Sequence, residues 1–416
     1  QGFIALRRME AVGPEPWERA TASPQVANEP DSVRARLLRS PISAGLLAGF
    51  FISVMGNLDG FIQLSRGVWY KISNPALAYP SFDFWRSSRM IPPLENIDPS
   101  PLVFWMPERL PGLRDVSWHI TEFPFFTFLF ADLHAHMMVI PFTLLVIALG
   151  ISLVVGLSDG GRRWIVTCGS ALGLALGALW VINSWDYPSY VVVVVVLVAL
   201  AAYCHTGPPA HRLTWFTVLI AGVLAVSILA FLPFHHNYET FDPGIAASKW
   251  NTPLHRYLGI HGLFIFVAGT FLIYEIIRPL KECLSGFFPV LAGRTDLGTV
   301  PRELFWRSIY LCVGLVAVIF FLAAGYWTVA VLLAFLVVTG LLAWVTLTGV
   351  KDAEHRTFAM VPLVLLGMAL LIGVGVDLVR LDGDIGRMNS LFKYYLEGWV
   401  LFSLASAYML WRMAWQ

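Results

Sequence analysis

Long apolar runs recur along the whole chain, and each is long enough to cross the hydrocarbon layer of a bilayer as a helix. We count ten of them, at residues 43–62, 125–156, 164–182, 188–204, 213–233, 258–277, 306–324, 327–348, 357–377 and 391–412. Only 13% of the 416 residues are charged, whereas soluble domains carry about a quarter. These features exclude a soluble globule and predict an all-α protein, a polytopic transmembrane helical bundle of about ten spans.

Basic residues follow alternate spans and predict how the chain is oriented in the membrane. They are Arg162 and Arg163, then Arg212, then Arg278 and Lys281, then Lys351 and Arg356. Because such residues favour the cytoplasmic side, we expect both ends of this chain in the cytoplasm and the protein in the cytoplasmic membrane. Residues 1–42 then form a flexible cytoplasmic tail, and residues 43–416 form the transmembrane domain. Residues 63–121 form an outer loop of short helices and turns.

Charge and cysteine content narrow the classes of function. The formal net charge is +1, which gives no reason to expect nucleic acid as a partner. The four cysteines lack any Cys-x-x-Cys spacing, so neither a zinc site nor a disulfide framework is expected. Polar residues at the outer ends of the spans are therefore the candidates for a functional site.

Two acids and two histidines enter the second span within residues 120–136. If this segment is extended, Asp132, His134 and His136 share one face and suit a divalent metal; if it is helical, His134 points away from the other two. A second interpretation is that the histidines only form hydrogen bonds at the interface. A third is catalytic, in which Asp132 or Glu122 accepts a proton from an acceptor hydroxyl. All three interpretations stay open.

A second polar cluster begins the last span. On a helix, Asn389, Lys393 and Glu397 form one stripe that enters the membrane, and Arg387 and Tyr394 lie on a neighbouring face. Fixed cations at this depth suit a phosphate group. The candidate substrate-binding residues are therefore Arg387, Asn389, Lys393 and Tyr394. The alternative is an internal ion pair of Lys393 with Glu397, and the sequence favours neither.

Two further outer positions are candidates for substrate binding. Asp186 lies in the turn at residues 183–190, where it is either a helix cap or an acid of the site. Arg86 lies beside aromatic residues in the outer loop, at residues 82–89. We expect Asp186 to meet the two clusters in one outer cavity, because burying each polar group without a partner would cost several kcal/mol. The residues of that cavity would be Glu122, Asp132, His136, Asp186, Arg387, Asn389 and Lys393.

Five motifs connect these candidates with a known family. They are GNLDGFIQ (Gly56 to Gln63), FDFWRSSRMI (Phe82 to Ile91), ITEFPFFTFLFADLHAHMMVIPF (Ile120 to Phe142), NSWDYPSY (Asn183 to Tyr190) and DIGRMNSLFKYYLEGWVL (Asp384 to Leu401). In this order they resemble the uncharacterised YYY membrane-protein family, which is similar to GT-C glycosyltransferases.

The resemblance implies an enzyme that transfers a sugar from a polyprenyl-phosphate-linked donor at the outer membrane face. Its partners would be membrane lipid and that donor. Either Asp132 or Glu122 would activate the acceptor. The cations Arg86, Arg387 and Lys393 would stabilise the departing phosphate.

Members of that family carry further N-terminal spans, an acidic outer loop and a tyrosine run, none of which is present in these 416 residues. GT-C enzymes usually place the catalytic acid in that loop, so we expect either a separate chain that supplies it or a longer parent protein. We therefore predict a GT-C-like glycosyltransferase or its C-terminal half. Two alternatives remain: a transporter, which needs ionisable residues near span midpoints, and a non-catalytic subunit of a larger membrane complex.

Overall fold

The structure is a computed structural model, and it describes most of the transmembrane region. The described residues are 40–91, 119–131, 133–159, 161–204, 208–239, 244–248, 251–291, 300–350, 352–381, 384 and 387–414. Nearly all of the predicted tail, a large part of the predicted outer loop and the candidate acid Asp132 lie outside them.

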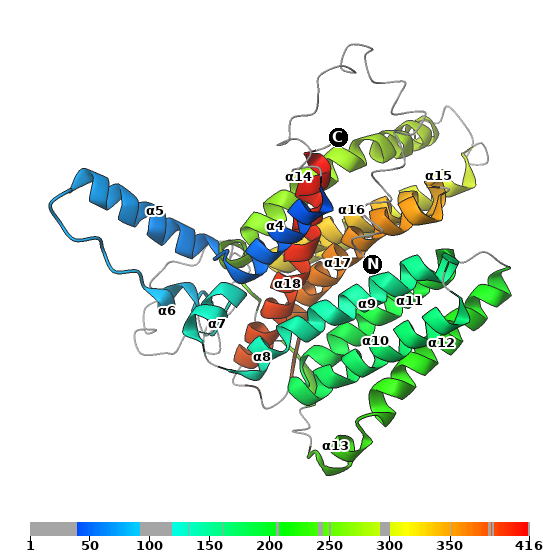
Figure 1. The fold of residues 1–416 in the computed structure, drawn as a ribbon. Helices are drawn as coiled ribbons and strands as arrows, with labels where there is room; N and C mark the ends of the chain where they lie inside the picture. Colours follow the sequence, from blue (N-terminus) through cyan, green and yellow to red (C-terminus); the bar gives the residue numbers. More distant parts are fainter. Residues whose placement is uncertain are drawn as a thin grey trace, which may run out of the picture.

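Helices dominate the described part of the chain (Figure 1). They are α4 (Pro41–Ser53), α5 (Leu58–Ser73), α6 (Phe84–Ser87), α7 (Pro124–Phe130), α8 (Ala135–Met138), α9 (Ile140–Asp159), α10 (Arg162–Ile182), α11 (Asp186–Cys204), α12 (Pro209–Leu229), α13 (Leu232–Asn237), α14 (Leu254–Leu291), α15 (Arg302–Ala323), α16 (Trp327–Gly349), α17 (Ala353–Leu378) and α18 (Met388–Met413). Two short strands, β1 (Ile245–Ala247) and β2 (Val379–Leu381), pair in antiparallel register with Ile245 opposite Leu381.

The all-α polytopic bundle predicted from the sequence is confirmed. Eight helices of the described chain are long and apolar enough to cross a membrane, and α4 with α5 makes nine if the pair counts as one broken span. The long helix α18 is not among these eight, and it carries Lys393 and Glu397 in its first half. Its 26 residues nevertheless extend over about 39 Å, which is enough to cross the bilayer.

Two predicted spans are broken rather than straight. The first ends after α4, whose 13 residues cover only about 20 Å, and α5 leaves at 84° to it. Asn57 starts α5 as its N-cap, because its side chain accepts a hydrogen bond from the Gly60 amide at 3.0 Å. The span predicted at 125–156 begins with the short helices α7 and α8. Ala131 ends α7 in the left-handed conformation, with φ of 55°.

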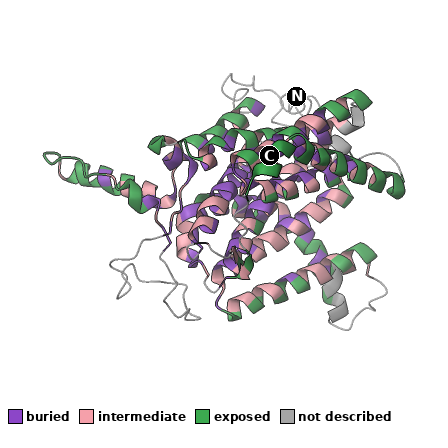
Figure 2. Cartoon of the chain, turned by 90° about the horizontal axis from the view of Figure 1, so that it is seen from below, coloured by how far each residue is buried: buried purple, intermediate pink, exposed green. Residues whose placement is uncertain are grey.

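The helix α5 also corrects the prediction that the outer loop holds only short helices and turns. It has 16 residues, extends away from the bundle in Figure 1, and exposes most of its surface in Figure 2. This helix of more than four turns begins within the first predicted span and continues for about three turns into the predicted outer loop.

The remaining helices form two packed groups. Helices α9 to α12 pack against one another, and α14 to α18 pack together with α4 (Figure 1). Helix α17 contacts both groups, and α18 lies between α4, α14 and α17. Buried Trp399 fixes α18 in this place, because its ring packs on Phe264 and its Nε1 donates to the Phe51 carbonyl at 3.0 Å.

The ends of the helices define the place of the candidate site. Helices α9, α11, α14, α16 and α18 begin at the same end of the bundle, where α10, α12, α15 and α17 finish. We call this the site end. The strands β1 and β2 also lie there, because β2 directly follows α17.

Candidate functional site

The group of polar residues around Lys393 joins the two helix groups at the site end. Lys393 Nζ donates to Asn183 Oδ1 at 3.3 Å and lies 5.3 Å from the centre of the Trp185 ring. Asn183 Nδ2 donates in turn to the buried carboxylate of Asp186. Tyr394 packs edge-on against Trp185, with 5.9 Å between ring centres. Two substrate-binding candidates from distant parts of the sequence, Lys393 and Asp186, are therefore connected through one amide.

The sequence left an ion pair between Lys393 and Glu397 as an alternative for this cluster. The described residues contain no ion pair between these two side chains. Lys393 points across to α10 and α11 instead, while Glu397 is buried one turn further along α18. Asn389 lies in the first turn of α18 and is half-buried, and its backbone amide donates to the Asp384 carboxylate at 3.0 Å.

Arg387 is the fully buried partner of Asp377. Its Nη1 donates to Asp377 Oδ1 at 2.7 Å, and its Nη2 donates to Thr252 Oγ1 at 2.9 Å. The Thr252 hydroxyl also contacts Asp377 at 2.6 Å and the Tyr395 hydroxyl at 3.0 Å. The geometry gives Arg387 a structural role, because it ties the end of α17 to the start of α18. This contact differs from the predicted role as a phosphate ligand, and that role receives no support from the geometry.

The carboxylate of Glu122 contacts the buried imidazole of His136. Glu122 Oε2 lies 3.2 Å from His136 Nε2, and the Thr127 hydroxyl donates to the same oxygen at 3.4 Å. The His136 ring packs edge-on against Phe392, with 4.6 Å between ring centres. The segments that carry Glu122 and Lys393 therefore touch at the site end, as the cavity hypothesis required.

The metal hypothesis for the histidines gains no support from this geometry. The rings of His134 and His136 stack with 5.3 Å between centres, and His136 is directed at Glu122. Within the described residues, no group of three or more His, Cys, Asp or Glu side chains is arranged to hold a metal ion. Asp132, the third predicted ligand, lies outside those residues, so we derive no step through a metal.

Arg86 belongs to a polar network that joins α5 to α6. Its Nη2 lies 3.0 Å from Asp59 Oδ1, and the Ser87 hydroxyl donates to the other oxygen of Asp59 at 2.9 Å. Gln63 Nε2 donates to both Asp59 and Ser87, at 2.9 Å each. Half of the Arg86 side chain (49%) stays exposed, so its guanidinium can contact a ligand while it neutralises Asp59.

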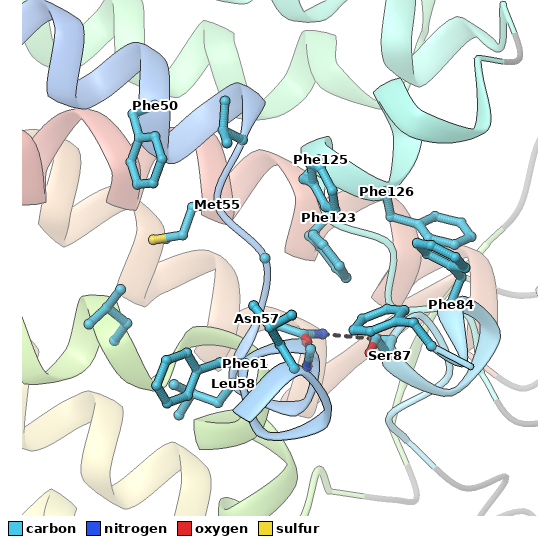
Figure 3. Close-up of a pocket in the computed structure, with 16 residues that line it drawn as sticks. Phe50, Met55, Asn57, Leu58, Phe61, Phe84, Ser87, Phe123, Phe125 and Phe126 are labelled. Carbon is cyan, nitrogen blue, oxygen red and sulfur yellow. Dashed lines mark hydrogen bonds between the residues drawn. The ribbon is translucent and has the colours of Figure 1, made fainter. Parts of the chain in front are cut away.

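An apolar groove of about 610 Å³ opens where the first span breaks (Figure 3). The end of α4, the start of α5, and α6, α7 and α14 contribute its walls. Aromatic rings line much of it: Phe50, Phe61, Phe82, Phe84, Phe123, Phe125 and Phe126. In Figure 3, Asn57 and Ser87 form its polar rim, where Asn57 Nδ2 donates to the Ser87 carbonyl at 2.7 Å. Such a groove fits an elongated apolar molecule with a polar end.

The groove adjoins the polar residues of the site end through a short series of contacts. Phe123 lines the groove, and Glu122 precedes it in the chain. Glu122 contacts His136, whose ring packs on Phe392 next to Lys393. Arg86 lies between the two groove-lining residues Phe84 and Ser87. Glu122 and Arg86 are therefore adjacent in the chain to residues of the groove, and Lys393 follows the residue that packs on His136.

Burial also lowers the pKa of two residues outside the spans. Desolvation, together with the nearby Arg387 guanidinium, lowers the pKa of His119 to about 4, although Asp384 acts in the opposite direction. Desolvation also lowers the pKa of Arg89, and the Glu122 carboxylate opposes that change. His119 is therefore neutral at pH 7.

Sequence reasoning missed three parts of this site: Asp377, Thr252 and the groove. Asp377 stands at the end of an apolar run, and that position alone identifies an ionisable residue that needs a partner. Thr252 had no such signal, because a threonine in a polar segment is common. The groove arises from the helix break between Val54 and Asn57, and the sequence indicated it only through Gly56 and the cap residue.

These features define a polytopic α-helical membrane protein with a polar site at one end of its bundle, next to an apolar groove. The chain belongs to the family described as "Uncharacterized membrane protein (DUF2298)", whose family model matches residues 27–402. No curated protein and no solved structure matches the chain.

Proposed function

We propose that this protein is a GT-C-like membrane glycosyltransferase, or part of one, that uses a polyprenyl-phosphate-linked sugar. The observation that supports this proposal is the apolar groove of about 610 Å³, whose lining residues adjoin Glu122 and Arg86 in the chain, at the end of the bundle that also carries Lys393. A polyprenyl chain needs a long apolar surface, and its phosphate needs positive charge at the rim.

In the proposed reaction, Glu122 is the base and receives the proton of an acceptor hydroxyl. The acceptor oxygen then bonds to the anomeric carbon of the sugar, and the bond between that carbon and the phosphate oxygen breaks. Polyprenyl phosphate leaves with the negative charge. His136, at 3.2 Å from Glu122, holds the carboxylate in place.

Arg86 and Lys393 are the cations that we assign to the phosphate. Arg86 precedes Ser87 of the groove rim and is half exposed, and Lys393 makes a single hydrogen bond to a described residue, at 3.3 Å. Asp186, Asn389 and Tyr394 complete the proposed substrate-binding residues around Lys393. Arg387 is not assigned to the phosphate, because Asp377 and Thr252 occupy its guanidinium.

We also propose that the site end faces the outside of the cytoplasmic membrane and that both chain ends are cytoplasmic. Arg162, Arg212 and Arg356 all lie in the first turn of helices that begin at the opposite end, where the cytoplasmic excess of positive charge is expected. Cysteines introduced at exposed His236 and Asp352 test this orientation in a variant without native cysteines. A membrane-impermeant maleimide should label position 236 in intact cells and position 352 only after lysis.

A binding assay tests the proposed phosphate cations, and a sugar-transfer assay tests the proposed base Glu122. Undecaprenyl phosphate should bind the purified protein in nanodiscs, and Arg86→Ala and Lys393→Ala should each weaken binding about tenfold or more. Glu122→Gln should bind normally but lose sugar transfer when polyprenyl-phosphate sugars are supplied. Arg302→Ala, an exposed cation at the opposite end, is the matched control and should bind like the wild type. Equal binding by all three cation variants would contradict the proposal.

A further inference from the structure

Two helix faces meet just below the contact between Lys393 and Asn183. Asp186 and Tyr190 are one turn apart on α11, and Lys393 and Glu397 are one turn apart on α18. Lys393 reaches Asp186 through Asn183, so the upper pair of positions faces each other. The same spacing brings Tyr190 and Glu397 together one turn deeper in the bundle.

The deeper pair is buried and poorly hydrogen-bonded to the residues that the structure describes. Tyr190 is 1% exposed and Glu397 is 4% exposed. Neither carboxylate oxygen of Glu397 has a hydrogen bond of normal geometry to a described residue, and neither does the Tyr190 hydroxyl. The side chain of Ser189 interacts with Glu397, and that of Thr143 interacts with Tyr190. Both side chains interact electrostatically with Asp186, and Glu397 also interacts with Lys393. Three oxygen atoms, two of Glu397 and one of Tyr190, therefore lie together in the bundle interior. None of them has a hydrogen bond of normal geometry to a described residue.

The charges of this cluster do not balance. Asp186 and Glu397 contribute two carboxylates, whereas Lys393 contributes one ammonium group, so one negative charge remains. The other titratable groups that act on this pair, Tyr190 and Tyr394, are phenols and add no positive charge. An unpaired buried charge is costly, and a buried carboxylate is normally neutralised or bound to a cation.

We propose that Glu397 and Tyr190, with Asp186 at the entrance, bind one exchangeable monovalent cation, either a proton or a sodium ion. The single missing charge favours a monovalent ion over a divalent one. The ligand atoms are all oxygen, which suits hard cations and protons rather than soft metals. This site lies inside the bundle, and its existence does not depend on the proposed sugar transfer.

Thermal unfolding of the purified full chain, followed by tryptophan fluorescence, tests the site. Sodium chloride is titrated against choline chloride at constant ionic strength, and the titration is repeated over a series of pH values. A bound cation should raise the melting temperature, because binding to the native state alone stabilises it. A rise with sodium at fixed pH identifies Na⁺. Without a sodium effect, a melting temperature that rises relative to Glu397→Gln as the pH falls identifies a proton.

Glu397→Gln removes the charge while it keeps the shape, so this variant should lose the rise with sodium, or the part of the pH dependence that a proton at this site contributes. Glu303→Gln, an exposed carboxylate at the start of α15, is the matched control and should respond like the wild type. If Glu397→Gln does not fold, Tyr190→Phe takes its place. Loss of one oxygen ligand should raise the half-saturating sodium concentration about tenfold, or shift the midpoint pH downward. Responses equal to the wild type in both variants would overturn the proposal, whatever the transfer assays show.

Discussion

Arg387 and Asp377 form an ion pair of 2.7 Å in which neither side chain reaches the solvent, with exposed fractions of 2% and 0%. The pair connects the start of α18 with the end of α17, and Thr252 joins it from the segment before α14. Three helices of one group are therefore fixed at the site end by one charged contact. Removing one partner of such a pair leaves the other charge buried and unpaired.

We predict that Arg387→Met and Asp377→Leu each destabilise the protein by about 3–5 kcal/mol. The double variant should recover much of that loss, because it buries no unpaired charge. Melting temperatures and urea unfolding in detergent measure these effects. Stable single variants would show that the pair contributes little, and would leave Arg387 available for the phosphate role predicted from the sequence.

The sequence was sufficient to predict the helices and insufficient to predict their contacts. A run such as residues 327–348 contains no charged residue, so hydrophobicity alone identifies the span that the structure shows as α16. The breaks after Ser53 and at Ala131 depend on local caps and backbone conformation, which act against an apolar sequence. The partner of Arg387 could not be predicted, because the pair forms only when α17 and α18 are packed side by side.

Helices α10 and α12 approach closely at Gly173. A Cβ atom at this position would lie 2.7 Å from the Val223 carbonyl oxygen, and the backbone of α12 cannot move aside cheaply. Gly173→Ala should therefore destabilise the protein by about 1–3 kcal/mol. Gly169→Ala, one turn earlier in the same helix, meets no atom within 4 Å and is the control. Equal melting temperatures for the two variants would contradict this close approach.

Stability should fall in mild acid because His119 is held neutral. Its pKa is about 4 in the folded protein and about 6.5 when unfolded. Between these values the unfolded chain binds more protons, so stability is fully present above about pH 6.5 and declines toward pH 4. His119→Gln should reduce this decline, whereas His236→Gln, at an exposed position, should not. Melting temperatures measured from pH 7 to pH 4 check the prediction, and identical slopes for all three proteins would refute it.

The groove should make binding depend on the length of the apolar chain. Undecaprenyl phosphate should bind more tightly than farnesyl phosphate, since a longer chain buries more apolar surface. Leu263→Trp fills the groove from α14 and should weaken binding of the longer lipid about tenfold. Leu284→Trp is the same change at an exposed position of the same helix. If Leu284→Trp also weakens binding, or if neither variant does, the lipid does not bind in the groove.

The helix α5 should lie along the surface of the membrane. It makes an angle of 84° with α4, and successive positions turn by about 100° around its axis. Val68 therefore points almost opposite to Arg66, although the two residues are close neighbours in sequence; Val68 shares its face with the exposed Phe61 and Ile72. Helices with this pattern bury their apolar face in the headgroup region.

Spin labels at positions 66 and 68, in a variant without native cysteines, measure the accessibility of these two positions in nanodiscs. Position 68 should be accessible to oxygen and position 66 to a water-soluble nickel complex. Equal accessibility at both positions would mean that α5 does not lie at the membrane surface.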